Sequence, residues 1–209
     1  MAKRKETVQV DWWAFEHEMM EAGFASVCGV DEAGRGPLAG PVYAAAVILP
    51  KNCIIEGLND SKKLTEAKRE KLYDIIKEKA VAYGIASASV AEIEELTILK
   101  ATFLAMRRAV AELEPMADAA LIDGNRLPEL DIPARAVVKG DALSASIAAA
   151  SVLAKVTRDR YMMTMHELYP EYAFDQHKGY GTALHCDRIR ELGPSPIHRP
   201  SFLKKILNK

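Results

Sequence analysis

Short apolar runs separated by glycine and proline mark the first part of the chain. One run covers residues 27–30 and leads into Asp31 and Glu32, and a second covers residues 42–49. Between them lies the segment AGRGPLAGP, whose composition is typical of a tight connection. The pattern predicts two strands joined by a short loop. We expect this pair to be antiparallel, because a parallel pair needs a long crossover.

Helical periodicity begins near residue 65. Apolar residues recur every three or four positions through residues 65–80 and again through residues 89–113, where Ser89 and Glu92 have the spacing of a capping box. One long helix is therefore predicted over residues 89–113. Another is predicted over residues 143–168, where the alanines and serines of SASIAAASVLAK would let it lie unusually close to a sheet.

The order of elements indicates the fold class. Further strands are predicted near residues 83–89, 119–122 and 134–138, and a short helix near residues 182–191 precedes a basic end. An antiparallel pair followed by alternating helices and strands favours an α/β fold with a mixed sheet. The length of 209 residues, 49% of them hydrophobic, provides one full core and little room for a second.

Composition indicates in which cellular environment the protein is expected to work. Its net charge is -1, which indicates no overall attraction for a polyanion. The three cysteines are too few and too scattered for a disulfide framework, and none forms a C-x-x-C pair for zinc. The first residues lack the apolar stretch of a secretory signal, and no apolar run approaches a membrane span. We therefore expect a cytoplasmic protein that does not enter a membrane.

Acidic residues occur where the predicted strands stop. Asp31 and Glu32 follow the first strand, Asp123 follows a later one and Asp141 lies just past another. Several carboxylates at one edge of a sheet would repel each other, and a hard cation such as Mg²⁺ or Mn²⁺ prefers such oxygen ligands. Two such ions can hydrolyse a phosphodiester. The alternative is that these acids are ordinary solvated turn residues.

A glycine loop follows the first acids. Gly34, Arg35 and Gly36 do not have the spacing of a dinucleotide-binding loop, and a strand rather than a helix is predicted after them. Such a loop lets backbone amides approach a sugar hydroxyl while Arg35 binds a phosphate, although a plain turn is the alternative. Lys62 belongs to a small basic group that could also be a solvated face, and Tyr180 could stack on a sugar or simply pack.

Asp159 is a further acid, in the segment AKVTRDRY of the long predicted helix, but its position argues against a shared site. A rise of about 1.5 Å per residue places it about 24 Å along the helix from the end near Asp141. It is expected to pair with Lys155, four residues earlier, or with a neighbouring arginine.

Longer segments carry a family resemblance. The sequence resembles bacterial ribonuclease HII, the type 2 ribonuclease H, from about residue 27 to residue 202, in the ordered segments GVDEAGRGPLAGPV, LNDSKKL, LIDGNRLP, VVKGDALSASIAAASVLAKVTRDR, QHKGYGT and HRPSF. The resemblance implies a ribonuclease H-like fold with a mixed five-stranded sheet, flanking helices and a C-terminal helical extension. It divides the chain into an N-terminal helical segment (1–25), a catalytic domain (26–170) and a C-terminal helical region that lines the substrate channel (171–209).

The resemblance also implies roles for individual residues. The catalytic acids would be Asp31, Glu32, Asp123 and Asp141, with the first three as the metal ligands for two divalent ions, Mn²⁺ or Mg²⁺. The substrate-binding residues would be Gly34, Arg35, Gly36, Lys62 and Tyr180: the glycine loop would recognise the 2′-hydroxyl at an RNA-to-DNA junction, and Tyr180 would pack against the following deoxyribose.

The expected activity is endonucleolytic. The enzyme would hydrolyse the RNA strand of RNA/DNA hybrids and cut 5′ to single ribonucleotides embedded in duplex DNA, as in ribonucleotide excision repair, leaving 3′-hydroxyl and 5′-phosphate ends. Two alternatives are a nuclease or resolvase of the same superfamily that acts on DNA alone, and a non-catalytic hybrid-binding module. The sequence indicates no protein partner, and we expect a monomer.

Overall fold

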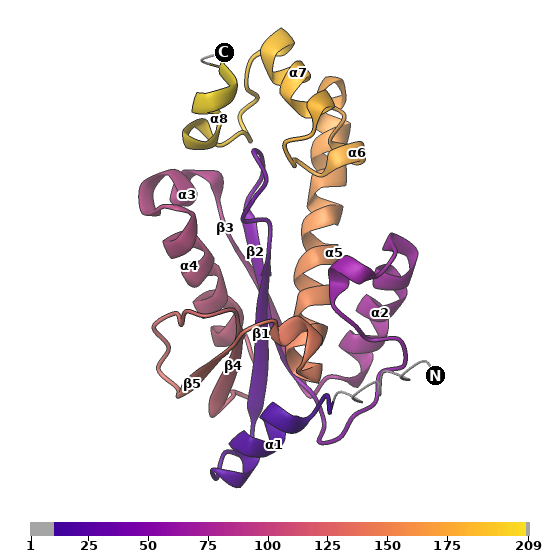
Figure 1. The fold of residues 1–209 in the computed structure, drawn as a ribbon, viewed down its shortest axis with the longest axis vertical. Helices are drawn as coiled ribbons and strands as arrows, with labels where there is room; N and C mark the ends of the chain where they lie inside the picture. The colour runs from indigo at the N-terminus through magenta and orange to yellow at the C-terminus, as the bar shows by residue number, and fades with distance from the viewer. Residues whose placement is uncertain (1–10, 208–209) are drawn as a thin grey trace, which may run out of the picture.

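A mixed sheet forms the middle of the molecule. The computed structural model describes residues 11–207, and within them the strands are β1 (Val27–Ala33), β2 (Val42–Ile48), β3 (Ala82–Ala88), β4 (Ala119–Asp123) and β5 (Ala134–Val137). Their order is β3-β2-β1-β4-β5 (Figure 1). The β1–β2 and β2–β3 pairs are antiparallel, whereas β1–β4 and β4–β5 are parallel. The predicted α/β class and five-stranded mixed sheet are confirmed.

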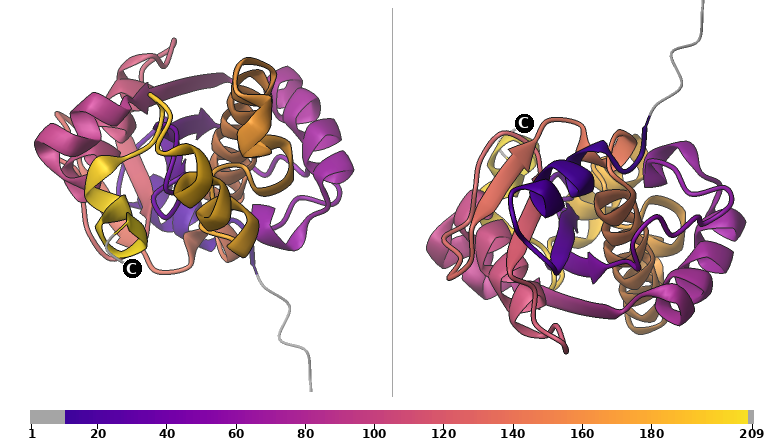
Figure 2. Two further views of the ribbon diagram at one scale, coloured as in Figure 1. Left: turned by 90° about the horizontal axis from the view of Figure 1, so that it is seen from above. Right: turned by 90° about the horizontal axis from the view of Figure 1, so that it is seen from below.

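Helices cover both faces of this sheet. They are α1 (Ala14–Glu21), α2 (Glu66–Lys79), α3 (Val90–Leu96), α4 (Ile98–Ala111), α5 (Ala145–Leu168), α6 (Phe174–His177), α7 (Ala183–Leu192) and α8 (Pro200–Leu207), with 3-10 turns η1 (Ser61–Lys63), η2 (Gly140–Ala142) and η3 (Pro170–Tyr172). Figure 2 shows α3 and α4 on one face and α2 and α5 on the other. Alternation along β2 explains both cores: Ala44 and Ala46 pack in the cluster with α4, and Ala45 and Val47 in the cluster with α5.

Helix α5 approaches the sheet closely, as its alanine-rich sequence predicts. A Cβ atom added at Gly29 of β1 would overlap the backbone of Ser146 and Ile147 at the start of α5. A glycine at this position therefore permits the contact between strand and helix. The close contact fixes the start of α5 relative to the strand that carries Asp31 and Glu32.

The single helix predicted over residues 89–113 is wrong in one respect. Two helices occupy this stretch, because Thr97 has φ 76° and ψ 155° and ends α3 before α4 begins. The capping box at the beginning of the predicted helix is present, since the Ser89 and Glu92 side chains bind each other's backbone amides. The spacing of apolar residues continues from α3 into α4, so the sequence pattern does not indicate where one helix ends and the next begins.

Both ends of the described chain pack onto this core. Helix α1 lies within the predicted N-terminal segment 1–25, although residues 1–10 fall outside the described range, and the adjacent Trp13 is buried. The helices α6, α7 and α8 gather near the far end of α5, beyond the β1–β2 connection (Figure 1). Helix α8 falls within the C-terminal region 171–209 that the resemblance implies to be helical, although the sequence pattern itself indicated only a basic end there. No helix within residues 11–207 is long and apolar enough to cross a membrane.

Candidate active site

Two of the predicted acids come from the central strand. The expectation that β1 stops before them is wrong: Asp31 and Glu32 are paired with Ala45 and Ala44 of β2, so β1 continues through both. Consecutive strand residues point to opposite faces. Asp31, which is 3% exposed, faces Ser151 of α5, and Glu32 lines a cavity together with residues of α4.

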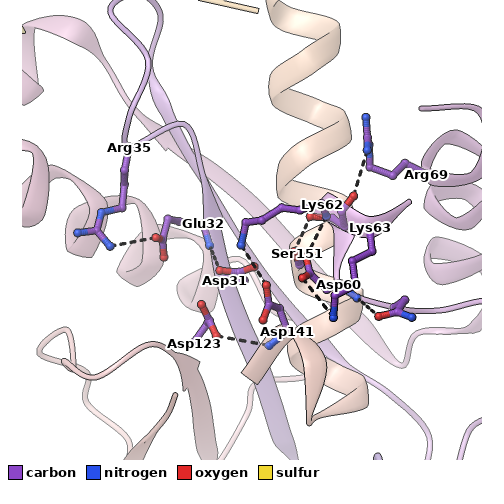
Figure 3. Close-up of polar contacts among 12 residues, drawn as sticks. Asp31, Glu32, Arg35, Asp60, Lys62, Lys63, Arg69, Asp123, Asp141 and Ser151 are labelled. Carbon is purple, nitrogen blue, oxygen red and sulfur yellow. Dashed lines mark hydrogen bonds and ion pairs between the residues drawn. The ribbon is translucent and has the colours of Figure 1, made fainter. Parts of the chain in front are cut away.

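The other two acids come from the neighbouring parallel strands. Asp123 ends β4 one position beyond the Val30–Ile122 pair, so the register places it beside Asp31. Asp141 lies in η2, just after β5, and its backbone N–H donates to Asp123 Oδ1 at 3.4 Å. Figure 3 shows the four carboxylates gathered at one edge of the sheet, as the sequence predicts.

Burial and like charge dominate the electrostatics of this group. Burial, together with the negative charges of Glu32 and Asp123, holds the pKa of Asp31 well above its ordinary value. Burial also raises the pKa of Glu32 against the opposing effect of Arg35, and burial with the charge of Asp141 raises the pKa of Asp123. These carboxylates disfavour one another's ionised form, which a nearby cation would reverse.

Two side-chain cations contact the acidic group in the structure. Lys62 Nζ lies 3.0 Å from Asp141 Oδ2, and Arg35 contacts Glu32 Oε1 at 3.2 Å. Burial acts to lower the pKa of Lys62, but its hydrogen bond and charge interaction with Asp141 outweigh this and raise it. Asp60 fixes the turn that carries Lys62, because its side chain accepts the Lys62 backbone N–H. The two exposed cations offset part of the negative charge.

The donor set suits a hard divalent ion. Asp31, Glu32, Asp123 and Asp141 offer only carboxylate oxygens, the ligands that Mg²⁺ and Mn²⁺ prefer. Within residues 11–207, no three acidic, histidine or cysteine side chains are already arranged to hold an ion. An ion would therefore bind by drawing these side chains together, and the mutual repulsion that raises their pKa values favours such a cation.

The glycine loop and the acids line the same cavity. This space has a volume of about 200 Å³, and its walls include Asp31, Glu32, Gly34, Arg35, Gly36, Lys62, Asp123 and Tyr180. Gly34 has φ +99°, a conformation that favours glycine, and a Cβ atom on Gly36 would lie 4.0 Å from the Tyr180 ring. Tyr180 is 41% exposed. The structure thus brings together the residues named from the sequence as catalytic or substrate-binding, with Asp141 joined through Lys62 and Asp123.

Sequence reasoning missed the polar support around these residues. Ser151 on α5 lines the cavity beside Asp31, and its Oγ lies 2.8 Å from Ser61 Oγ. The only signal for Ser151 is a hydroxyl within an otherwise apolar helix face. Asp159 is placed as predicted, away from the acids, with Lys155 Nζ at 2.7 Å from its Oδ1 and Arg69 at 3.9 Å.

Comparison with known proteins agrees with this geometry. The family model described as Ribonuclease HII matches residues 28–205. The chain belongs to the ribonuclease HII family. The Ribonuclease HII of Dechloromonas aromatica (strain RCB) is 61% identical over 176 residues, which are 84% of this chain and 90% of that protein. That of Caldicellulosiruptor saccharolyticus is 50% identical over 200 residues, 96% of this chain and 98% of that protein.

A solved structure gives the same result for the fold. The crystal structure of the ribonuclease H2 from Pyrococcus horikoshii OT3 matches with a TM-score of 0.73 and 26% identity, covering 88% of this chain and 98% of that one. Membership in the ribonuclease HII family confirms the resemblance found in the sequence. It makes the chain an enzyme, a ribonuclease of the H class.

Proposed function

We propose that this ribonuclease HII hydrolyses the RNA strand of RNA/DNA hybrids and cuts on the 5′ side of single ribonucleotides embedded in duplex DNA. The observation that carries the proposal is the shared cavity, which is lined by three of the acids, by the glycine loop and by an exposed tyrosine. Phosphodiester chemistry and sugar recognition would then occur side by side.

The acids would hold the metal ions. Asp31, Glu32 and Asp123 are the proposed ligands, and Asp141 completes the site from η2. Two divalent ions, Mg²⁺ or Mn²⁺, supply an activated water and neutralise charge on the leaving oxygen when bound. Hydrolysis breaks the bond between phosphorus and the 3′ oxygen, so the products carry a 3′-hydroxyl and a 5′-phosphate.

The glycine loop, Tyr180 and Lys62 would recognise the substrate. The side chain of Arg35 is 51% exposed and lines the cavity, so it would bind a backbone phosphate of the substrate. The side-chain position of Gly34 is filled by Arg158, whereas that of Gly36 is open towards the Tyr180 ring. A sugar would approach the loop backbone at Gly36, with the exposed ring of Tyr180 as a flat surface beside it. Lys62 would leave Asp141 to contact a phosphate, since its exposed side chain is free to turn.

An Asp123→Asn variant tests the assignment of the acids. The amide keeps the shape of Asp123 but removes a charged ligand, so cleavage of an RNA/DNA hybrid in Mg²⁺ is expected to disappear while the circular dichroism spectrum is unchanged. Asp131→Asn is a matched control, because Asp131 is exposed in the connection between β4 and β5. Full activity of the Asp123 variant would refute the assignment. The cytoplasmic location and the monomeric state stay predictions from the sequence.

A further inference from the structure

A fully buried arginine binds the backbone of the glycine loop, residues 34–40. Arg199, immediately before α8, has no exposed surface and makes no ion pair within residues 11–207. Its guanidinium instead binds backbone carbonyls of the loop. Nε donates to Gly40 O at 2.9 Å, Nη1 to Arg35 O at 3.0 Å and Pro37 O at 2.8 Å, and Nη2 to Gly34 O and Gly40 O at 2.7 Å each.

These contacts use every donor of the side chain. A guanidinium has five N–H groups, and all five point at carbonyls of residues 34–40. A charged group without an acidic partner is costly to bury, and burial, with repulsion from Arg158 as a second cause, lowers the pKa of Arg199 to about 9. An apolar side chain would suffice for packing alone, so the hydrogen bonds to the loop are the distinctive property of Arg199.

The direction of the carbonyls fixes the direction of the amides. In a planar trans peptide the C=O and the following N–H point in opposite directions. Because the carbonyls of Gly34 and Arg35 are turned towards Arg199, the N–H groups of Arg35 and Gly36 point away from it, and both residues line the cavity. Neither amide donates to another group in the part of the chain that the structure describes.

Arg158 reinforces the same loop from α5. Its guanidinium donates to Pro41 O at 3.3 Å, Ala39 O at 3.1 Å and Lys178 O at 3.0 Å. The last of these contacts joins the loop to the segment that carries Tyr180, whose ring lies 5.7 Å from the guanidinium carbon. Arg158 thus binds carbonyls in the far half of the loop, whereas within residues 11–207 the carbonyls of Gly34 and Arg35 accept hydrogen bonds from Arg199 only.

We propose that Arg199 is a positioning residue for ribonucleotide recognition, which holds two carbonyls inward so that the amides of Arg35 and Gly36 present paired donors to a sugar 2′-hydroxyl oxygen. Arg199 itself does not touch the substrate. The inference rests on the proposed function of the cavity, and it adds a residue of the C-terminal region to the recognition of the ribose.

The test measures discrimination rather than activity alone. Binding to a DNA duplex with one ribonucleotide and to the same duplex without it is measured by fluorescence anisotropy in Ca²⁺, at constant ionic strength. The ratio of the two affinities is expected to fall about tenfold in Arg199→Lys and Arg199→Ala, the effect of losing one or two oriented hydrogen bonds. Added guanidinium chloride is expected to restore the ratio in Arg199→Ala, relative to an equal concentration of NaCl.

Leu203→Ala is the matched control. Leu203 is buried in the same helix but belongs to none of the contacts with the loop, so this variant is expected to unfold at a lower temperature and to keep the wild-type ratio. A wild-type ratio in the Arg199 variants, or an equal fall in Leu203→Ala, would overturn the role of Arg199. Absence of both cleavage and discrimination in the wild-type protein would instead overturn the proposed function itself.

Discussion

Removing the charge of Asp31 is expected to stabilise the protein while abolishing cleavage. Asp31 is buried beside the charges of Glu32 and Asp123, and Lys62 is the cation that acts on it from η1. Asparagine has the same shape, and its oxygen still accepts the Glu32 backbone N–H that Asp31 Oδ1 accepts at 2.7 Å. The substitution therefore changes charge with little change in packing.

The size of the effect follows from Coulomb's law. Two unit charges about 5 Å apart at an effective dielectric near 20 interact by about 3 kcal/mol. Asp31 experiences two such repulsions and one attraction, and solvent in the open cavity with partial protonation reduces the difference to about 2 kcal/mol. For a chain of this length, about 2 kcal/mol corresponds to a rise in Tm of roughly 4 to 8 °C.

Thermal unfolding with and without metal measures this effect. In chelator, Asp31→Asn is expected to melt above the wild-type protein, whereas the exposed control Asp131→Asn melts with it. In Mn²⁺ the wild-type protein gains stability by binding the ion, so the advantage of the variant shrinks or reverses. A variant that melts below the wild-type protein in chelator would refute the claim that the acids repel one another.

Three further predictions concern the core, the pH dependence and the loop. Gly29→Ala is expected to lower the free energy of unfolding by about 3 kcal/mol, because its methyl group would overlap the backbone of α5; unchanged urea unfolding would contradict this. Burial lowers the pKa of His185 and His198 to about 4, so their contribution to stability is complete above pH 6.5 and is lost as the pH falls towards 4. His185→Leu should weaken this loss in urea unfolding at pH 5 and 7, and an identical loss would count against it. Arg35→Ala is expected to reduce cleavage at a single ribonucleotide severely and Tyr180→Phe only modestly, since the ring remains; equal, negligible effects would exclude both from recognition.

The sequence was sufficient to predict contacts between residues that are close together in the chain. Ser89 caps α3, as its spacing from Glu92 indicates, and the i,i+4 pair of Lys155 and Asp159 forms as expected. The acids could be found for a different reason. Parallel strands in an α/β sheet end at a common edge, and β1, β4 and β5 are parallel, so the acids at or just past the ends of these strands meet there.

Features set by distant parts of the chain were not predictable. Strand β1 includes Asp31 and Glu32 because β2 provides backbone partners for them, which outweighs the polar pattern that indicates a strand end. Arg199 binds backbone carbonyls that lie more than 150 positions earlier in the chain. Every residue has a backbone carbonyl, so the pattern of side chains does not indicate such contacts. From the sequence alone, Arg199 is expected to be exposed like most basic residues, whereas in the structure it is fully buried.

Cleavage of a duplex with one embedded ribonucleotide tests the central claim most directly. The substrate is compared with an all-DNA duplex of the same sequence, in Mg²⁺, in Mn²⁺ and in chelator, and the ends of the products are identified. The account predicts one cut on the 5′ side of the ribonucleotide, with a 3′-hydroxyl and a 5′-phosphate, only when metal is present. Equal cutting of the all-DNA duplex, or undiminished cutting in chelator, would contradict it.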